Sequence, residues 1–179
     1  DDPDDVEPYL ANVFADPELL SLPPLLAPFR PLVAKAIASS RAPSAKLAMA
    51  GAGGGAPLAR AAASSISTVR AQAAALEARL AERGVAARLF VATRYWKPSA
   101  ADAVADMKTQ NITKLVILPL YPQFSISTSG SALRVLEQML YTTPGFPMKS
   151  TVVPSWYNRP LYVEAMARGI AAELASLGE

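Results

Sequence analysis

The chain of 179 residues contains no cysteine and no histidine. Without cysteine it cannot form disulfides or thiolate metal sites, and no iron–sulfur cluster is expected in it. Without histidine it lacks the commonest general base and metal ligand, and a Ser-His-Asp triad is excluded within the chain. Any chemistry must therefore use carboxylates, tyrosine, lysine or arginine, or a histidine from another chain.

Long apolar runs and excess charge are scarce as well. No run of about 18 apolar residues occurs, so we expect no transmembrane helix. The 17 basic and 15 acidic residues give a net charge of +2 with no dense basic cluster, which argues against a nucleic-acid partner. The acidic start, DDPDDVEPYL, does not read as a signal or transit peptide.

What is present predicts a folded chain of one ordinary domain. Apolar residues make up 51% and charged residues 18% of the sequence, enough to bury a core. Apolar spacing predicts a sequence of helices and three short strands. The predicted helices cover residues 6–14, 32–39, 67–83, 99–110, 131–141 and 161–177, and the predicted strands lie in 87–93, 115–118 and 151–153. Gly84 is a predicted C-cap and Ser99 a predicted N-cap.

The order of these elements predicts the fold class. Strands alternate with helices after a helix-rich start, which indicates an α/β fold with a parallel sheet and helices on both faces. The run Leu115–Leu118 is continuously apolar, as in a strand buried on both faces. Three strands make a thin sheet. The segment AGAGGGAP, residues 50–57, is either a linker or a backbone that approaches a ligand closely.

The stretch LPLYPQFSISTSGSALRVL, residues 118–136, predicts a ligand site. In open parallel sheets, ligands bind outside the carboxyl ends of the strands. Pro119 and Pro122 end the strand, and the Ser/Thr-rich residues before the next helix are capping types, with Gly130 allowing close approach. A helix N-terminus favours a carboxylate or phosphate. The alternative is a capped turn without a ligand, but Tyr121, Gln123 and Phe124 favour a large planar ligand with anionic groups.

Two aromatic motifs follow the other predicted strands. Arg94-Tyr95-Trp96-Lys97-Pro98 comes after the strand that ends near Thr93, and Ser155-Trp156-Tyr157 after the one that ends near Val153. A single Trp-Tyr pair is more often edge packing than a site. Three such segments at one sheet edge predict a pocket with aromatic walls and an arginine.

These motifs together resemble the ferrochelatase family. Residues 118–134, LPLYPQFSISTSGSALR, look like its signature stretch, with only Ser129 and Ala132 departing from the usual Thr and Ser. The segments at 5–10, 14–17, 41–43, 53–58, 94–98 and 154–157 follow in the family's order. Local departures are Ser21, Ala56 and Lys97. The residues of these motifs are most similar to those of plant, algal and cyanobacterial members.

The resemblance implies that residues 1–179 are an N-terminal chelatase subdomain, Rossmann-like with three layers and a parallel sheet, truncated at both ends. Family members begin with a strand upstream of Asp1. They continue beyond Glu179 to a catalytic His and a second subdomain with a functional Glu. We therefore expect no catalytic residue in this chain, weak porphyrin binding and little or no turnover.

The implied activity is insertion of ferrous iron into protoporphyrin IX to form protohaem. Both are substrates, and no cofactor is expected. Arg94 and Tyr95 are assigned by resemblance to the face where the metal enters. The residues implied to bind porphyrin are Arg94, Tyr95, Tyr121, Gln123, Ser125, Ser127, Thr128 and Ser131.

Two other functions stay open at this point. A half-length chelatase could form its cleft as a homodimer, as short relatives in the superfamily do, although the metal-binding His is missing. A non-catalytic sugar-phosphate-binding module would use SISTSGS as a phosphate loop, although Tyr-Pro-Gln and the order of the other motifs disfavour it.

Compartment and membrane contact follow from the resemblance only in outline. The motif residues indicate a chloroplast member, and a location in a mitochondrion or a bacterial cytoplasm stays open. Peripheral membrane contact is common in the family, and the apolar segment Leu19–Phe29, LLSLPPLLAPF, is the candidate for it. A packed connector is an equally good interpretation of that segment.

Overall fold

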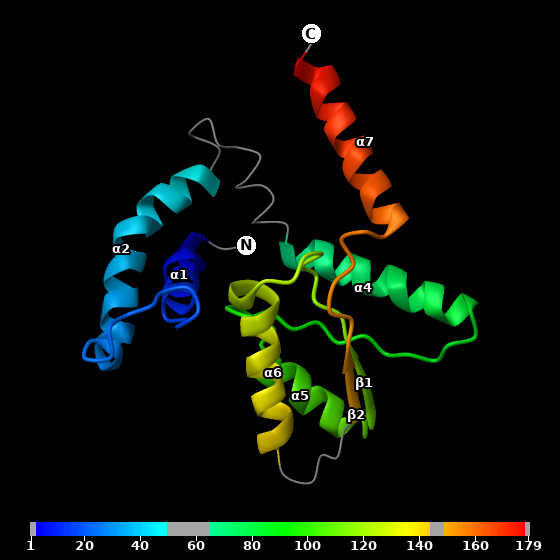
Figure 1. The fold of residues 1–179 in the computed structure, drawn as a ribbon, viewed down its shortest axis with the longest axis horizontal. Coiled ribbons are helices and arrows are strands. Elements are labelled where there is room, and N and C mark those ends of the chain that lie inside the picture. The colour runs from blue at the N-terminus through cyan, green and yellow to red at the C-terminus, as the bar shows by residue number, and fades with distance from the viewer. Residues whose placement is uncertain (1–2, 50–64, 144–148, 178–179) are drawn as a thin grey trace. The chain divides into compact units, whose positions relative to one another are not determined.

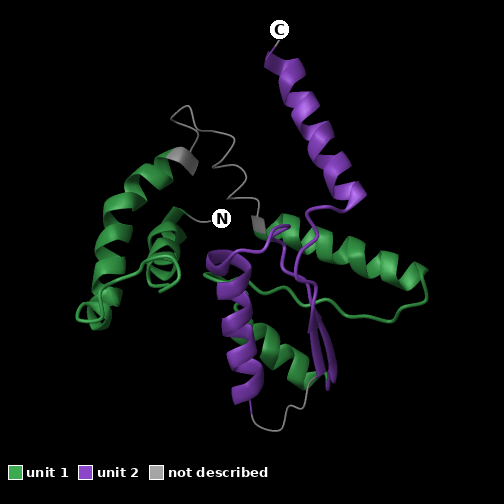
Figure 2. Ribbon diagram, in the orientation of Figure 1, with its two compact units in different colours: residues 1–110 green, residues 111–179 purple. Residues whose placement is uncertain are grey.

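The computed structural model describes residues 3–49, 65–143 and 149–177. Within it the chain forms two compact units, residues 1–110 and 111–179 (Figure 2). The glycine-rich segment at 50–57 lies outside the described residues. That residues 1–179 form one chelatase subdomain stays a prediction.

Helices make up most of both units (Figure 1). Unit 1 contains η1 (Pro3–Asp5), α1 (Val6–Phe14), η2 (Ala27–Phe29), α2 (Arg30–Met49), α4 (Ser65–Glu82) and α5 (Ala100–Thr109). Unit 2 contains β1 (Lys114–Ile117), η3 (Ile126–Gly130), α6 (Ser131–Thr142), β2 (Lys149–Val152) and α7 (Pro160–Leu177). The predicted helices are confirmed, although α2 extends well beyond its predicted end and the turn η3 precedes α6. No helix of the described residues has the length and apolarity that crossing a membrane requires.

Helix α2 runs through Pro43, whereas the sequence predicted its end before Arg41. Proline lacks the N–H that would bond to the carbonyl four residues earlier, so it usually ends or kinks a helix. Here Ala34, Ala38 and Ala42 are 1%, 0% and 3% exposed. Their spacing of four places them in one row, and α2 packs against α1. This close packing of small side chains offsets the proline and continues the helix.

Polar contacts join the same two helices. The Ser39 hydroxyl donates to a Glu7 carboxylate oxygen at 2.5 Å, and Lys46 Nζ lies 3.2 Å from Asp4 Oδ1. Later residues of α2 pair with earlier residues of this segment, so the two helices run antiparallel. The pair therefore holds α1 in a defined position within unit 1.

The strand predicted in residues 87–93 does not form. Residues 85–92 carry no regular structure, and Thr93 makes only an isolated parallel bridge with Ser99. A strand needs a neighbour for its backbone N–H and C=O groups, and no described segment supplies one to LFVA. An open hollow of about 270 Å³ beside it is lined by Arg70, Leu89, Phe90, Val91, Pro98, Ala103 and Asp106.

The sheet of the described residues has two parallel strands, β1 and β2. Lys114 pairs with Lys149 and Ile117 with Val152, and α6 lies between the strands in sequence. This is a β-α-β arrangement and is compatible with the predicted α/β class. The predicted three-layer Rossmann-like form stays a prediction. Val116 is 66% exposed, so the expectation that β1 is buried on both faces is wrong. An apolar run indicates that a strand can be buried on both faces, but it does not show that other elements pack on both of them.

Sequence signals at helix ends are confirmed. Gly84 has a φ of +73°, and the Val85 N–H bonds back to the Leu80 carbonyl at 2.9 Å, which is the expected glycine-type helix end. Helix α5 begins with a capping box. The Ser99 hydroxyl accepts from the Asp102 N–H, and the Asp102 carboxylate accepts from the Ser99 N–H at 2.8 Å.

The capping box predicts a pH-dependent contribution to stability. The Ser99 backbone N–H, followed by its hydroxyl, lowers the pKa of Asp102 below the ordinary value of 3.8. A lowered pKa gives stability that is present above the ordinary value and is lost as pH falls through the lowered one. Ser99→Ala should lower the free energy of unfolding by about 1 kcal/mol near neutral pH. Urea unfolding measured across pH checks this. The difference in the free energy of unfolding between wild type and Asp102→Asn should vanish in acid. A difference that stays constant across pH would contradict the prediction.

Candidate functional site

In unit 1, the Arg94-Tyr95-Trp96 motif lies on a closed loop. The Thr93 N–H and hydroxyl both donate to the Pro98 carbonyl, at 2.7 and 3.1 Å. The capping box at Ser99 follows directly. The loop is thus fastened at both of its ends, which limits the positions that the side chains between them can take.

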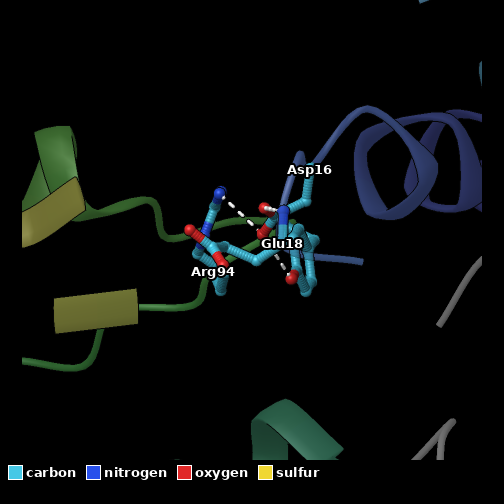
Figure 3. Close-up of polar contacts among 4 residues, drawn as sticks. Asp16, Glu18 and Arg94 are labelled. Carbon is cyan, nitrogen blue, oxygen red and sulfur yellow. Dashed lines mark hydrogen bonds and ion pairs between the residues drawn. The ribbon is translucent and has the colours of Figure 1, made fainter. Parts of the chain in front are cut away.

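The Asp16 carboxylate holds the first two residues of this motif (Figure 3). Its Oδ2 accepts from Arg94 Nη2 at 2.9 Å and from the Tyr95 hydroxyl at 2.8 Å. Its Oδ1 accepts from the Glu18 backbone N–H at 2.8 Å. The Asp16 side chain is 1% exposed and that of Arg94 21%. A buried carboxylate is costly unless it is paired and hydrogen-bonded, so the three donors account for its burial.

Helix α1 contacts the rest of the motif. Asn12 Nδ2 donates to the Tyr95 carbonyl at 2.9 Å, and the Tyr9 and Trp96 rings meet edge to face with centroids 6.4 Å apart. Residues 9, 12 and 16 follow the spacing of one helical face. This face of α1 and its exit turn therefore align all three residues of the motif.

In unit 2, the segments after β1 and β2 are bonded to each other. The Trp156 indole N–H donates to the Pro119 carbonyl at 2.8 Å. The backbone N–H groups of Trp156 and Tyr157 donate to the Pro122 carbonyl at 2.9 and 3.1 Å. Two of the three segments predicted to share one sheet edge therefore meet at the carboxyl ends of neighbouring parallel strands, whereas the third, Arg94–Pro98, does not follow a strand among the described residues.

A π-helical turn that the sequence did not predict precedes the helix after this loop. Helix α6 begins at Ser131 as predicted, and η3 begins at Ile126 and leads into it. The Gly130 N–H donates to the Ser125 carbonyl at 2.9 Å, and the Ser131 N–H donates to that of Ile126. The helical segment therefore starts directly after Ser125, whose carbonyl also accepts from the Thr128 N–H at 3.3 Å. Ser127 and Thr128 lie within the turn instead of capping it.

The predicted ligand residues of unit 2 differ in accessibility. Tyr121 and Phe124 are 40% and 56% exposed, Gln123 is exposed, and Ser125, Ser127 and Thr128 are half-buried. The Ser125 and Ser127 hydroxyls lie 2.9 Å apart. Ser131 is buried, and so is Ser129, whose hydroxyl has no hydrogen-bond partner among the described residues.

The structure thus brings the predicted residues together in two sets. Arg94 and Tyr95 form one in unit 1, and the residues of the 121–131 loop form the other in unit 2. Sequence reasoning missed Asp16 and Asn12 as their supports. The signal available in the sequence was Asp16 itself, an acidic residue that follows the end of the first helix and directly precedes Pro17. The described residues hold no group of three or more His, Cys, Asp or Glu side chains able to bind a metal.

These features define a class: an α/β protein with aromatic and hydroxyl-rich loops at the carboxyl ends of parallel strands and an arginine–tyrosine pair on a buried carboxylate. The family model described as Ferrochelatase matches residues 1–179. The chain belongs to the ferrochelatase family.

Curated relatives agree with the family match. Over 98% of its length the chain is 45% identical to Ferrochelatase-2, chloroplastic, of Arabidopsis thaliana, covering 33% of that protein. It is 45% identical over 97% of its length to Ferrochelatase of Thermosynechococcus vestitus and 46% over 96% to that of Rippkaea orientalis, covering 43% and 42% of them. The chain therefore spans a third to two fifths of the length of these relatives.

Gly130 provides a test of the loop geometry. It is helical, with a φ of −62°, and an added Cβ would meet the Ser125 carbonyl at 3.4 Å and the Phe124 ring at 3.7 Å, both ordinary contacts. Gly130→Ala should therefore raise the free energy of unfolding by about 0.5–1 kcal/mol, because alanine loses less backbone entropy in a helix. Urea unfolding measures this, with Gly169→Ala, which meets nothing within 4 Å, as the matched control. A loss of stability confined to Gly130→Ala would contradict the described packing.

Proposed function

We propose that this chain is the porphyrin-side part of a ferrochelatase, which inserts ferrous iron into protoporphyrin IX to form protohaem in the last step of haem biosynthesis. The observation that carries the proposal is the bonded pair of strand-end loops, Pro119–Pro122 and Trp156–Tyr157, in a chain that the family model matches from end to end. We extend the proposal to the fold, a Rossmann-like chelatase-type domain with three layers.

The chemistry of the loops suits a porphyrin. The macrocycle is a flat apolar ring, and the exposed Tyr121 and Phe124 rings offer it contact area. Its two propionates are anions, and the start of η3 after Ser125 offers backbone N–H groups and a partial positive charge. Gln123, Ser127 and Thr128 add amide and hydroxyl donors nearby in sequence. Ser131 belongs to the proposed set as well, although in this structure its side chain is buried.

The proposal places Arg94 and Tyr95 on the side from which iron enters. Insertion of one ferrous ion releases two pyrrole protons, so the reaction needs proton acceptors. The sequence offers no histidine for this. We propose that these acceptors are supplied from outside the 179 residues, and that this chain binds and orients the substrates.

Porphyrin binding by the chain tests the proposal. We expect quenching of tryptophan fluorescence by protoporphyrin IX, with weak affinity and little or no metal insertion. Tyr121→Ala should weaken binding by about tenfold, because stacking of a flat ring, such as a nucleobase, on one aromatic side chain contributes on the order of 1–3 kcal/mol. Tyr141→Ala, which removes a tyrosine of α6 that is 84% exposed, is the control and should leave binding unchanged. Binding of sugar phosphates in place of porphyrin would favour the alternative function.

Catalytic competence requires the rest of the enzyme. In a chimera, residues 1–179 replace the matched segment of the Thermosynechococcus ferrochelatase. We expect this chimera to insert iron, and clear insertion by the 179 residues alone would contradict the proposed division of labour.

We further propose peripheral membrane contact through the start of α2 and the segment before it. Leu25, Phe29 and Leu32 are 85%, 53% and 67% exposed, and Arg30 and Lys35 lie beside them in the sequence, as anionic lipid surfaces favour. Apolar substrates and products make such a location useful to the enzyme.

Vesicle flotation tests this contact. Leu25→Ser with Leu32→Ser should reduce the fraction bound to phosphatidylglycerol vesicles about tenfold or more, because each leucine loses up to about 1.5–3 kcal/mol of burial. Leu47→Ser, an exposed leucine near the other end of α2, should have no effect. Equal loss in both variants would mean that general surface apolarity, not this segment, drives binding.

We also propose a plastid location. Its support is that the plant relatives carry the word chloroplastic in their names and that the two other relatives named above are cyanobacterial. Import of the full-length protein into isolated chloroplasts checks it.

A further inference from the structure

Asp16 is the one charged residue in the buried set of the described chain. Its two carboxylate oxygens divide their partners. Oδ1 accepts from the Glu18 N–H within its own turn, and Oδ2 accepts from the side chains of Arg94 and Tyr95, 78 and 79 residues away. The local bond orients the carboxylate, and the distant bonds use that orientation to place two side chains (Figure 3).

The bond from Tyr95 determines how its oxygen meets any further partner. A phenol has one proton, and here it points to Asp16 Oδ2 at 2.8 Å. Toward another group the same oxygen can act only as an acceptor. Cations seek such acceptors, and oxygen is a normal ligand atom for divalent metals.

The bond from Arg94 determines the local charge. A guanidinium keeps its positive charge at all ordinary pH values and repels a divalent cation. Asp16 Oδ2 lies 2.9 Å from Arg94 Nη2, and the two opposite charges offset each other. The guanidinium carbon also lies over the Tyr95 ring, 4.7 Å from its centroid, so a cation–π contact holds the arginine against the phenol as well.

We propose that Asp16 is the positioning residue of the iron-entry side: it directs the Tyr95 proton inward, so that the phenol oxygen faces an incoming divalent cation as an acceptor, and it offsets the charge of Arg94. This inference rests on the proposed function, which places Arg94 and Tyr95 on that side. Asp16 acts through these two residues and need not touch iron itself.

The first test uses the 179-residue chain labelled with a carbon isotope at the tyrosine ζ-carbon. The Tyr95 resonance is assigned by its loss in Tyr95→Phe, and zinc, which does not change oxidation state, is the probe. Zinc should shift the Tyr95 resonance of wild type, and Asp16→Asn should need about tenfold more zinc or more. Asp16→Glu, which restores the charge, should recover part of the response.

The matched control is Asp4→Asn. It makes the same acid-to-amide change beside α1 and also removes an ion pair, with Lys46, but its side chain is 90% exposed. Asp16→Asn should fold, because Arg94 is 21% exposed and reaches solvent; thermal unfolding of both variants checks this. If Asp16→Asn unfolds, Asp16→Glu takes its place in the test. At an equal folded fraction, Asp16→Glu should then need more zinc than wild type to shift the Tyr95 resonance. No zinc shift in wild type, or equal shifts in wild type and Asp16→Asn, would overturn the proposal.

A second test separates this inference from the proposed function. In the active chimera, Asp16→Asn should raise the KM for ferrous iron about tenfold and leave porphyrin affinity unchanged. An active chimera in which this KM does not change overturns the role of Asp16 and leaves the proposed function intact. An inactive wild-type chimera counts against the proposed function, whereas the zinc response still decides on Asp16.

Discussion

Unit 1 is organised around one buried negative charge. A carboxylate that is 1% exposed is costly to bury unless it is paired and hydrogen-bonded, and Asp16 accepts from donors in its own turn and in a loop 78 residues further along the chain. That requirement sets where the exit of α1 and the Arg94–Trp96 loop lie relative to each other. The alanine row of α2 contributes to this arrangement indirectly, because its small side chains allow α1 to pack closely on α2.

Unit 2 is built differently. The buried apolar side chains of the described residues, such as Val104 and Met107, all lie in unit 1. The order in unit 2 comes from backbone pairing of β1 with β2 and from the bonds of Trp156 to Pro119 and Pro122. Helix α7 has no buried residue among those described, and Ile170 and Leu174 are 57% and 64% exposed on it. This unit keeps its strand-end loops in place with hydrogen bonds more than with a core.

The sequence predicted most features that depend on neighbours in the chain. The helix positions, the N-cap at Ser99 and the helix end at Gly84 are local, and so is the exit of β1 at Pro119. Apart from the π-helical turn at Ile126–Gly130, the failures involve distant partners. Residues 87–92 have strand composition but no described neighbour to pair with, and α2 passes Pro43 because of packing on another helix. The role of Asp16 was hidden for the same reason: an acid after a helix looks like an ordinary turn residue until its partners are placed in space.

The π-helical turn has a consequence for how this loop tolerates change. Its hydrogen bonds reach back five residues, from Gly130 to Ser125 and from Ser131 to Ile126, so it holds one residue more than an α-helical turn does. Removing that residue would restore ordinary helix geometry and turn every side chain on its N-terminal side by about 100° around the axis. Insertions and deletions here are therefore not neutral in the way that surface-loop length changes usually are. The extra residue therefore sets the direction in which Ser127 faces relative to α6, so a change of length alone would reorient its hydroxyl.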